Sequence, residues 1–140
     1  MMSQDFASGI NLVSLQEAFD GSEEVLAQML GLFQVQAVER MGQLNAHLAA
    51  WDTTCARTAL HSLINISGAV RAYAMSELAK AVGEAVKRED RELAQKTARV
   101  LGQETERVLA MVKAMLDAAR QNPLEIWNVP LVGLGHGITP

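Results

Sequence analysis

The stretch SEEVLAQMLGLFQVQAVERMGQLNAHLAAW, residues 22–51, decides the fold class of this chain. Its apolar residues recur at steps of three or four, which places them on one face of a long helix. These residues are Leu26, Leu30, Phe33, Ala37, Met41, Leu44, Leu48 and Trp51. Ser22, followed by two glutamates, suits the start of this helix, because hydroxyl and acidic side chains favour its unpaired N–H groups. Gly31 and Gly42 each weaken a helix by about 1 kcal/mol relative to alanine, so packing against other helices has to stabilise it.

The same pattern predicts one short helix before residues 22–51 and three longer helices after them. Candidate caps are Asn11 or Ser14 for the short helix, Asp52, Thr53 or Thr54 for the next, and Asp90 for the last. The expected core positions of the three later helices are Ala56, Leu60, Leu63, Ser67 and Val70; Met75, Leu78, Val82 and Ala85; and Leu93, Thr97, Val100, Val108, Met111 and Met115. The last helix is predicted to run to about Arg120, with a charged corner before it.

The predicted fold is all-α. We expect residues 1–121 to form an up-down-up-down four-helix bundle whose short first helix covers one end. The dipeptide Asn122-Pro123 ends the helical part, because proline restricts its predecessor and cannot continue a helix. An apolar C-terminal tail, residues 122–140, follows, and its large apolar residues are Trp127, Leu131, Val132, Leu134 and Ile138. These residues are too apolar to be left in water, so we expect the tail to pack on its own bundle; docking on a second copy or a partner stays an alternative.

The bulk properties exclude several classes of function. A net charge of −4 argues against a nucleic-acid binder, which usually needs a concentrated positive face. The single cysteine, Cys55, rules out an internal disulfide framework and a cysteine metal cluster. No apolar run approaches the roughly 20 residues that cross a bilayer, and the N-terminus lacks a signal pattern. We therefore expect a cytoplasmic protein that binds neither nucleic acid nor membrane.

The candidate functional residue is His61, in the stretch ALHSLINISGAVRA at residues 59–72. At about 100° per residue, its side chain lies roughly 140° from the centre of the core stripe of its helix, so it is predicted to project into solvent. Its neighbours at helical spacing are Arg57, Thr58, Ile64, Asn65 and Gly68. No pair of histidines has metal-ligand spacing on a helix, and His61 is therefore not predicted to bind a metal.

These residues carry a resemblance that covers most of the chain. His61, Ser62 and Leu63 match the His-Ser-Leu core of the histidine-containing phosphotransfer (HPt) domains of bacterial phosphorelays. The stretch FDGSEEVLAQMLGLF is similar to the opening of that family and its leucine-rich run, and VKREDRELA resembles its charged corner before the last helix. Other positions in family register are Met41, Leu44, Leu48, Asp52, Gly68, Met75, Leu78 and Val82. The chain thus resembles an HPt domain.

The resemblance implies that His61 is a phosphoacceptor. Its neutral imidazole would attack the aspartyl phosphate of a response-regulator receiver domain, or return the phosphoryl group to that aspartate. The partner is then a receiver domain, a hybrid histidine kinase or both. The resemblance places the magnesium ion on the receiver, so this chain needs no cofactor and has no ATP-dependent kinase activity of its own. We expect a monomer, and a dimer formed through the tail stays an alternative.

The chain departs from the family pattern at three positions. Ile64 replaces a lysine that the family uses to favour the phosphoryl group, and Asn65 replaces a glycine that leaves room beside the imidazole. Arg71 replaces a later glycine at a helix end, where a shifted turn would avoid backbone strain. The phosphoryl neighbourhood is then predicted to be Arg57, Asn65 and Gly68, with Arg57 as a substitute cation.

These departures leave two functions open. Either the chain carries phosphate, or it is a pseudo-HPt adaptor that binds a receiver or kinase without carrying phosphate. In both cases we expect docking on the surface of the second and third helices around His61, with Thr58 and Ile64 as contacts. Ile64 lies only about 80° from the centre of the core stripe, so it can equally flank the core.

Overall fold

The computed structural model of the chain describes residues 6–129, and these residues form helices but no strand. The helices are α1 (Leu12–Phe19), α2 (Glu23–Ala50), α3 (Thr53–Ala69), α4 (Tyr73–Lys87), α5 (Arg91–Ala118) and the short 3-10 helix η1 (Pro123–Trp127). The all-α prediction is confirmed for this part of the chain. None of these helices is long and apolar enough to cross a membrane.

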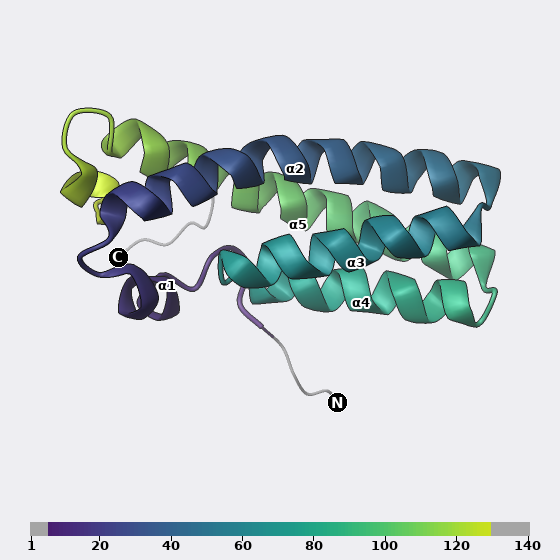
Figure 1. Cartoon of the computed structure of the whole chain (residues 1–140). Coiled ribbons are helices and arrows are strands. Elements are labelled where there is room, and N and C mark those ends of the chain that lie inside the picture. Colours follow the sequence, from purple (N-terminus) through teal and green to yellow (C-terminus); the bar gives the residue numbers. More distant parts are fainter. Residues whose placement is uncertain (1–5, 130–140) are drawn as a thin grey trace.

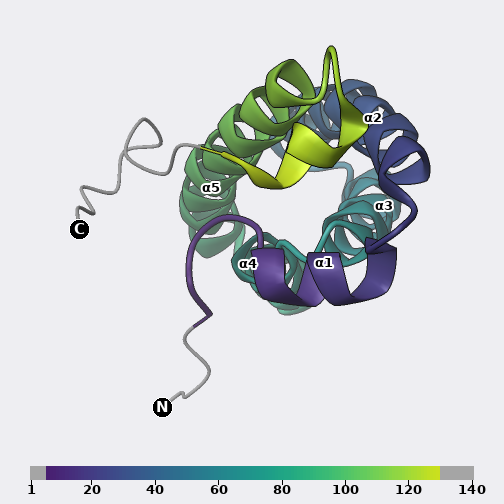
Figure 2. The ribbon, with the colours of Figure 1, turned by 90° about the vertical axis from the view of Figure 1, so that its left-hand side faces the viewer.

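The long helices α2 to α5 lie alongside one another as a helical bundle (Figure 1). Helix α2 contacts α3 and α5, and α4 contacts the same two helices. The view along the bundle shows α1 and η1 lying across the same end (Figure 2). The short first helix therefore covers one end, as predicted.

The core agrees with the predicted stripe of α2 almost throughout. Its first seven positions, from Leu26 to Leu48, are buried. Trp51 is the exception, because it follows the helix as the C-cap and is only half-buried. The opposite face of α2 is also apolar in part, since Val25, Leu32, Val35 and Val38 are exposed.

The predicted stripe of α5 is wrong in its first half. Leu93 and Val100 are 40% and 45% exposed, whereas Ala94, Ala98 and Leu101 are buried. The observed stripe runs through positions 94, 98, 101, 105, 108, 112 and 115, in unbroken steps of four and three. Alanine gives a weak hydrophobic signal, so the larger Leu93 and Thr97, one position before Ala94 and Ala98, predict a stripe that is shifted by one residue.

Helix α4 shows a smaller difference. Leu78 is half-buried, and Ser76 and Ala79 occupy the buried positions beside it. The hydroxyl oxygens of Ser76 and Ser67 lie 2.6 Å apart in a hydrogen bond, and the Ser67 hydroxyl also donates to the carbonyl oxygen of Leu63 at 2.7 Å. This pairing satisfies two polar groups inside the α3–α4 interface.

Three of the predicted caps are present. The side chains of Asn11, Asp52 and Asp90 each accept a hydrogen bond from a backbone N–H in the first turn of their helix. Ser22 precedes α2, but its side chain makes no capping bond. Helix α5 ends at Ala118, close to the predicted end at about Arg120, and Pro123 begins η1.

Each corner between the long helices contains a residue in the left-handed region. Trp51, Arg71 and Glu89 have φ values of 54°, 63° and 59°. The expectation that a shifted turn would spare Arg71 this conformation is therefore wrong. Its guanidinium donates to the carbonyl oxygen of Ala69 at 3.0 Å, so the side chain itself helps to cap α3.

The segment before α1 is attached to α5 through a buried carboxylate. The Ser8 hydroxyl donates to Oε1 of Glu104 at 2.7 Å, and the N–H of Gly9 donates to Oε2 at 2.7 Å. Only glycine fits at position 9, because φ is 85° and an added Cβ would lie 2.6 Å from the sulfur of Met111. These contacts hold the N-terminal segment against one end of the bundle.

The first part of the predicted tail also packs on the bundle. Ile126 is fully buried, and η1 contacts α2 and α5. The indole N–H of half-buried Trp127 donates to Oε2 of Glu23 at 3.1 Å. Leu131, Val132, Leu134 and Ile138 lie outside the described residues, so the packing of the whole tail stays a prediction.

Glycine at position 89 is expected to stabilise the protein. A residue with a Cβ at φ 59° carries a strain of about 1 kcal/mol, which glycine relieves. Glu89→Gly should therefore raise the midpoint of urea unfolding. Glu84→Gly, at an exposed position inside α4, is the matched control and should lower the free energy of unfolding by about 1 kcal/mol. A lower midpoint for both variants would contradict the strain argument.

The contact between Trp127 and Glu23 is expected to make stability depend on pH. The indole N–H, followed by the backbone N–H of Gly21, lowers the pKa of the Glu23 carboxyl. A lowered pKa stabilises the fold above the pKa of the unfolded chain, and this contribution is lost as the pH falls through the folded pKa. The stability difference between wild type and Trp127→Phe, measured by urea unfolding, should shrink on acidification. A difference that does not change with pH would contradict this role.

Candidate functional site

His61 lies near the midpoint of α3, and its side chain is exposed, as predicted. The buried stripe of α3 includes Leu60 and Leu63 on either side of it in sequence, which turns the imidazole away from the core. Its ring borders an open hollow of about 250 Å³ between α3 and α4. The hollow is lined by Arg57, Leu60, His61, Ile64, Lys80, Gly83 and Glu84. The hollow lies on the α4 side of His61, whereas docking is predicted on the surface of α2 and α3 around it.

Helix α4 brings Lys80 to the hollow, a cation that the sequence analysis did not identify. Its ammonium nitrogen lies 3.0 Å from Oε2 of Glu77, and both side chains are about half-exposed. Exposed ion pairs of this kind are weak, so Lys80 can exchange its partner for a more highly charged anion at little cost. The only sequence signal was a lysine on the polar face of the next helix, and its relation to His61 depends on how α3 and α4 align.

Of the three residues predicted to surround the phosphoryl group, Arg57 and Asn65 are exposed, whereas Gly68 is half-buried. Arg57 is exposed and borders the hollow with His61, and Asn65 is exposed one turn after the histidine. Gly68 is half-buried against α4, where an added Cβ would lie 4.0 Å from the Ser76 hydroxyl oxygen. A Cβ at this position would make only an ordinary van der Waals contact, so the packing of α3 on α4 does not require glycine here.

The two predicted docking residues lie on opposite flanks of α3. Ile64 is half-buried, packs against the core and borders the hollow beside His61. Thr58 is exposed and borders a separate groove between α2 and α3. Its hydroxyl donates to the carbonyl oxygen of Thr54 at 3.3 Å, inside its own helix. A partner that contacts both residues has to cover the whole outer face of α3.

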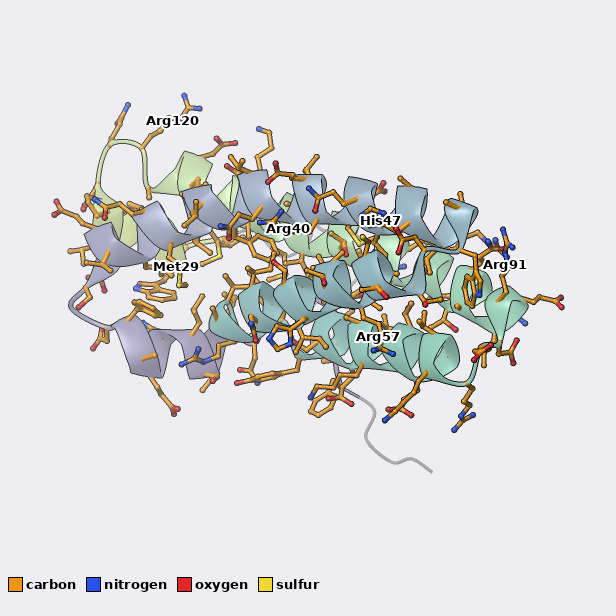
Figure 3. The ribbon with its side chains drawn as sticks, turned by 45° about the vertical axis from the view of Figure 1, so that its right-hand side comes forward. Met29, Arg40, His47, Arg57, Arg91 and Arg120 are labelled. Atoms are coloured by element: carbon orange, nitrogen blue, oxygen red, sulfur yellow. The ribbon has the colours of Figure 1, made fainter. Side chains whose placement is uncertain are left out.

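The groove between α2 and α3 has a volume of about 360 Å³. Its lining residues are Arg40, Gln43, His47, Cys55, Thr58, Ala59 and Ser62. Nε of Arg40, which is labelled on α2 in Figure 3, donates to the Ser62 hydroxyl of α3 at 3.0 Å, so this hydrogen bond joins the two helices. The Ser62 hydroxyl thus takes part in a hydrogen bond between α2 and α3, and we assign it no role at His61.

A comparison with known proteins finds no matching family model, no similar curated protein and no similar solved structure.

The site can bind a small anionic group. It combines an exposed imidazole with two cations, Arg57 from α3 and Lys80 from α4, around one hollow. The open space above Gly83, where an added Cβ would meet no atom within 4 Å, widens the approach from the α4 side. Glu84 also lines the hollow, and its negative charge reduces the positive electrostatic potential there.

Proposed function

We propose that the chain is a histidine phosphotransfer protein built on an up-down-up-down four-helix bundle. In this proposal His61 accepts and donates a phosphoryl group with a receiver domain in a two-component phosphorelay. The observation that carries the proposal is the exposed imidazole at the midpoint of α3, beside a hollow with cations from two helices. Residues 19–33 and 61–63 resemble the HPt pattern, and this resemblance is the reason for proposing a receiver domain as the partner.

The transfer is a nucleophilic displacement at phosphorus. A ring nitrogen of His61 forms the N–P bond while the P–O bond to the receiver aspartate breaks, and the aspartate leaves as a carboxylate. The receiver supplies the magnesium ion and the acidic pocket that stabilise the transferring group. This chain contributes the nucleophile and its docking surface, and it acts as a carrier rather than a kinase.

Arg57 and Lys80 replace the cation that is missing at Ile64. Ile64 has no charge and packs on the core, so it cannot stabilise a phosphoryl group electrostatically. Arg57 and Lys80 border the hollow from two helices and can approach the phosphoryl oxygens from either side of the imidazole. Both side chains are exposed, and therefore each should change the rate of transfer by a modest factor.

The alternative function is a pseudo-HPt adaptor, which binds a receiver or kinase without carrying phosphate. It is favoured by the half-buried isoleucine at the lysine position and by the Asn65 side chain one turn from the histidine. An adaptor keeps the docking face but gives up the chemistry of His61. The same assay separates the two functions.

The first experiment measures transfer of labelled phosphate from receiver domains charged with acetyl phosphate. Wild type should become labelled, and His61→Gln should not, because glutamine offers no nucleophilic ring nitrogen. His136→Gln makes the same substitution at another histidine and should be labelled like wild type. Receiver binding without label on wild type would contradict the carrier and support the adaptor. Label that persists in His61→Gln would contradict both.

The second experiment tests the cation from α4. Lys80→Gln should slow phosphoryl transfer by about two- to fivefold, the range of one exposed charge pair. Lys87→Gln removes an exposed lysine in the last turn of the same helix, which does not border the hollow, and is the matched control. High salt should reduce the difference between Lys80→Gln and wild type, because it screens exposed charges. Equal rates for the two variants would contradict the role of Lys80.

A further inference from the structure

Three side chains with metal-binding atoms converge at the corner between α2 and α3. His47 belongs to the last turn of α2, Asp52 caps α3, and Cys55 lies in the first turn of α3. One imidazole nitrogen, one carboxylate oxygen and the thiol sulfur all lie within 4.8 Å of one another. This set lies on the α2 side of α3, whereas the hollow of His61 lies on the α4 side.

The backbone of this corner is held by several contacts. Trp51 takes a left-handed conformation, and the N–H of Asp52 donates to the carbonyl oxygen of His47 at 2.8 Å. Arg91 of α5 donates to the carbonyl oxygen of Ala49 at 2.9 Å, and its guanidinium lies 5.6 Å from the centroid of the Trp51 ring. The three candidate ligands are therefore presented from a fixed turn rather than from a free loop.

We propose that His47, Asp52 and Cys55 bind one zinc ion, with water as the fourth ligand. Imidazole nitrogen, carboxylate oxygen and thiolate sulfur are the ligand types that zinc takes in proteins, and three protein ligands plus water are typical of an open site. Bond lengths of about 2.0–2.3 Å in tetrahedral geometry require ligand atoms about 3.3–3.8 Å apart. All three separations are within 4.8 Å, so the ligand atoms can reach this spacing through rotation of their side chains.

The carboxylate can cap the helix and bind the ion at once. Oδ1 of Asp52 accepts the N–H of Cys55 at 3.1 Å, which leaves its second oxygen for the metal. Asp52 raises the pKa of the Cys55 thiol, through a hydrogen bond first and its charge second. The sulfur has to release its proton to solvent as it coordinates, so zinc binding is accompanied by proton release.

Arg40 is the cation that borders the same groove. Its guanidinium is directed to other partners, because it donates to Ser62 at 3.0 Å and Gln43 at 3.2 Å and lies 3.7 Å from Glu39. Figure 3 shows Arg40 and His47 at different positions along α2, and the two residues are about two turns apart in sequence. Arg40 therefore does not occupy the position between the three ligands.

The test is a titration of the full chain, kept reduced, with cobalt(II) as a spectroscopic substitute for zinc. Wild type should bind one ion with the absorption of a thiolate-to-cobalt charge transfer and the intense visible bands of tetrahedral cobalt. Zinc should displace the cobalt and raise the melting temperature. Cys55 is the one cysteine of the chain, so the charge-transfer band reports on this site alone.

Three variants and one control complete the experiment. Cys55→Ser should abolish the charge-transfer band, and His47→Gln should weaken binding by more than about tenfold. Asp52→Asn should also weaken binding, while it keeps the helix cap, because asparagine caps as well as aspartate. His61→Gln removes an exposed histidine on the other flank of α3 and should bind cobalt like wild type. Binding without a charge-transfer band, or equal binding by wild type and Cys55→Ser, would overturn the proposal.

Discussion

The structure depends above all on the burial of one face of α3 between α2 and α4. Ala56, Leu63 and Ser67 are fully buried, and the Ser67 hydroxyl is hydrogen-bonded to Ser76 inside the α3–α4 interface. With that face fixed, a residue on the other side of the helix has to point into solvent. The exposure of His61 is thus a consequence of core packing, and the imidazole would be buried if α3 were rotated so that His61 took the place of Leu60. The chemistry proposed for this protein needs no special loop, because the bundle itself presents the nucleophile.

The outer face of α3 separates two different environments. On the α4 side, His61 shares a hollow with Arg57 and Lys80, which suits an anionic phosphoryl group. On the α2 side, His47 and Cys55 border a groove that ends at the Asp52 cap, which suits a cation. Segments at one end of the bundle are attached by two buried carboxylates, Glu104 and Glu23, and within residues 6–129 they leave the ring of His61 exposed. The two candidate sites therefore share no lining residue.

The sequence predicted those features that depend on strong local patterns. The buried stripe of α2 is made mainly of large apolar residues, so the face of this helix that is buried was clear from the sequence. The caps Asn11, Asp52 and Asp90 were predictable because each has a short side chain that accepts a hydrogen bond from a backbone N–H in the first turn. The phase of α5 was missed because its first two buried positions, 94 and 98, are alanines, and Leu93 beside the first of them is larger and more hydrophobic. Lys80 was missed because its place beside His61 depends on the packing of α3 on α4, which no local pattern encodes. The left-handed Arg71 was missed because its side chain caps α3 and so compensates a conformation that favours glycine.

The most direct test of the central claim is whether the imidazole of His61 can be phosphorylated at all. Incubation of the full chain with phosphoramidate, a small donor that needs no partner, can be followed by phosphorus NMR. The account predicts one phosphohistidine resonance in wild type that is absent from His61→Gln, because the ring stands open on the surface of α3. A wild-type spectrum without phosphohistidine, or the same resonance in His61→Gln, would contradict it.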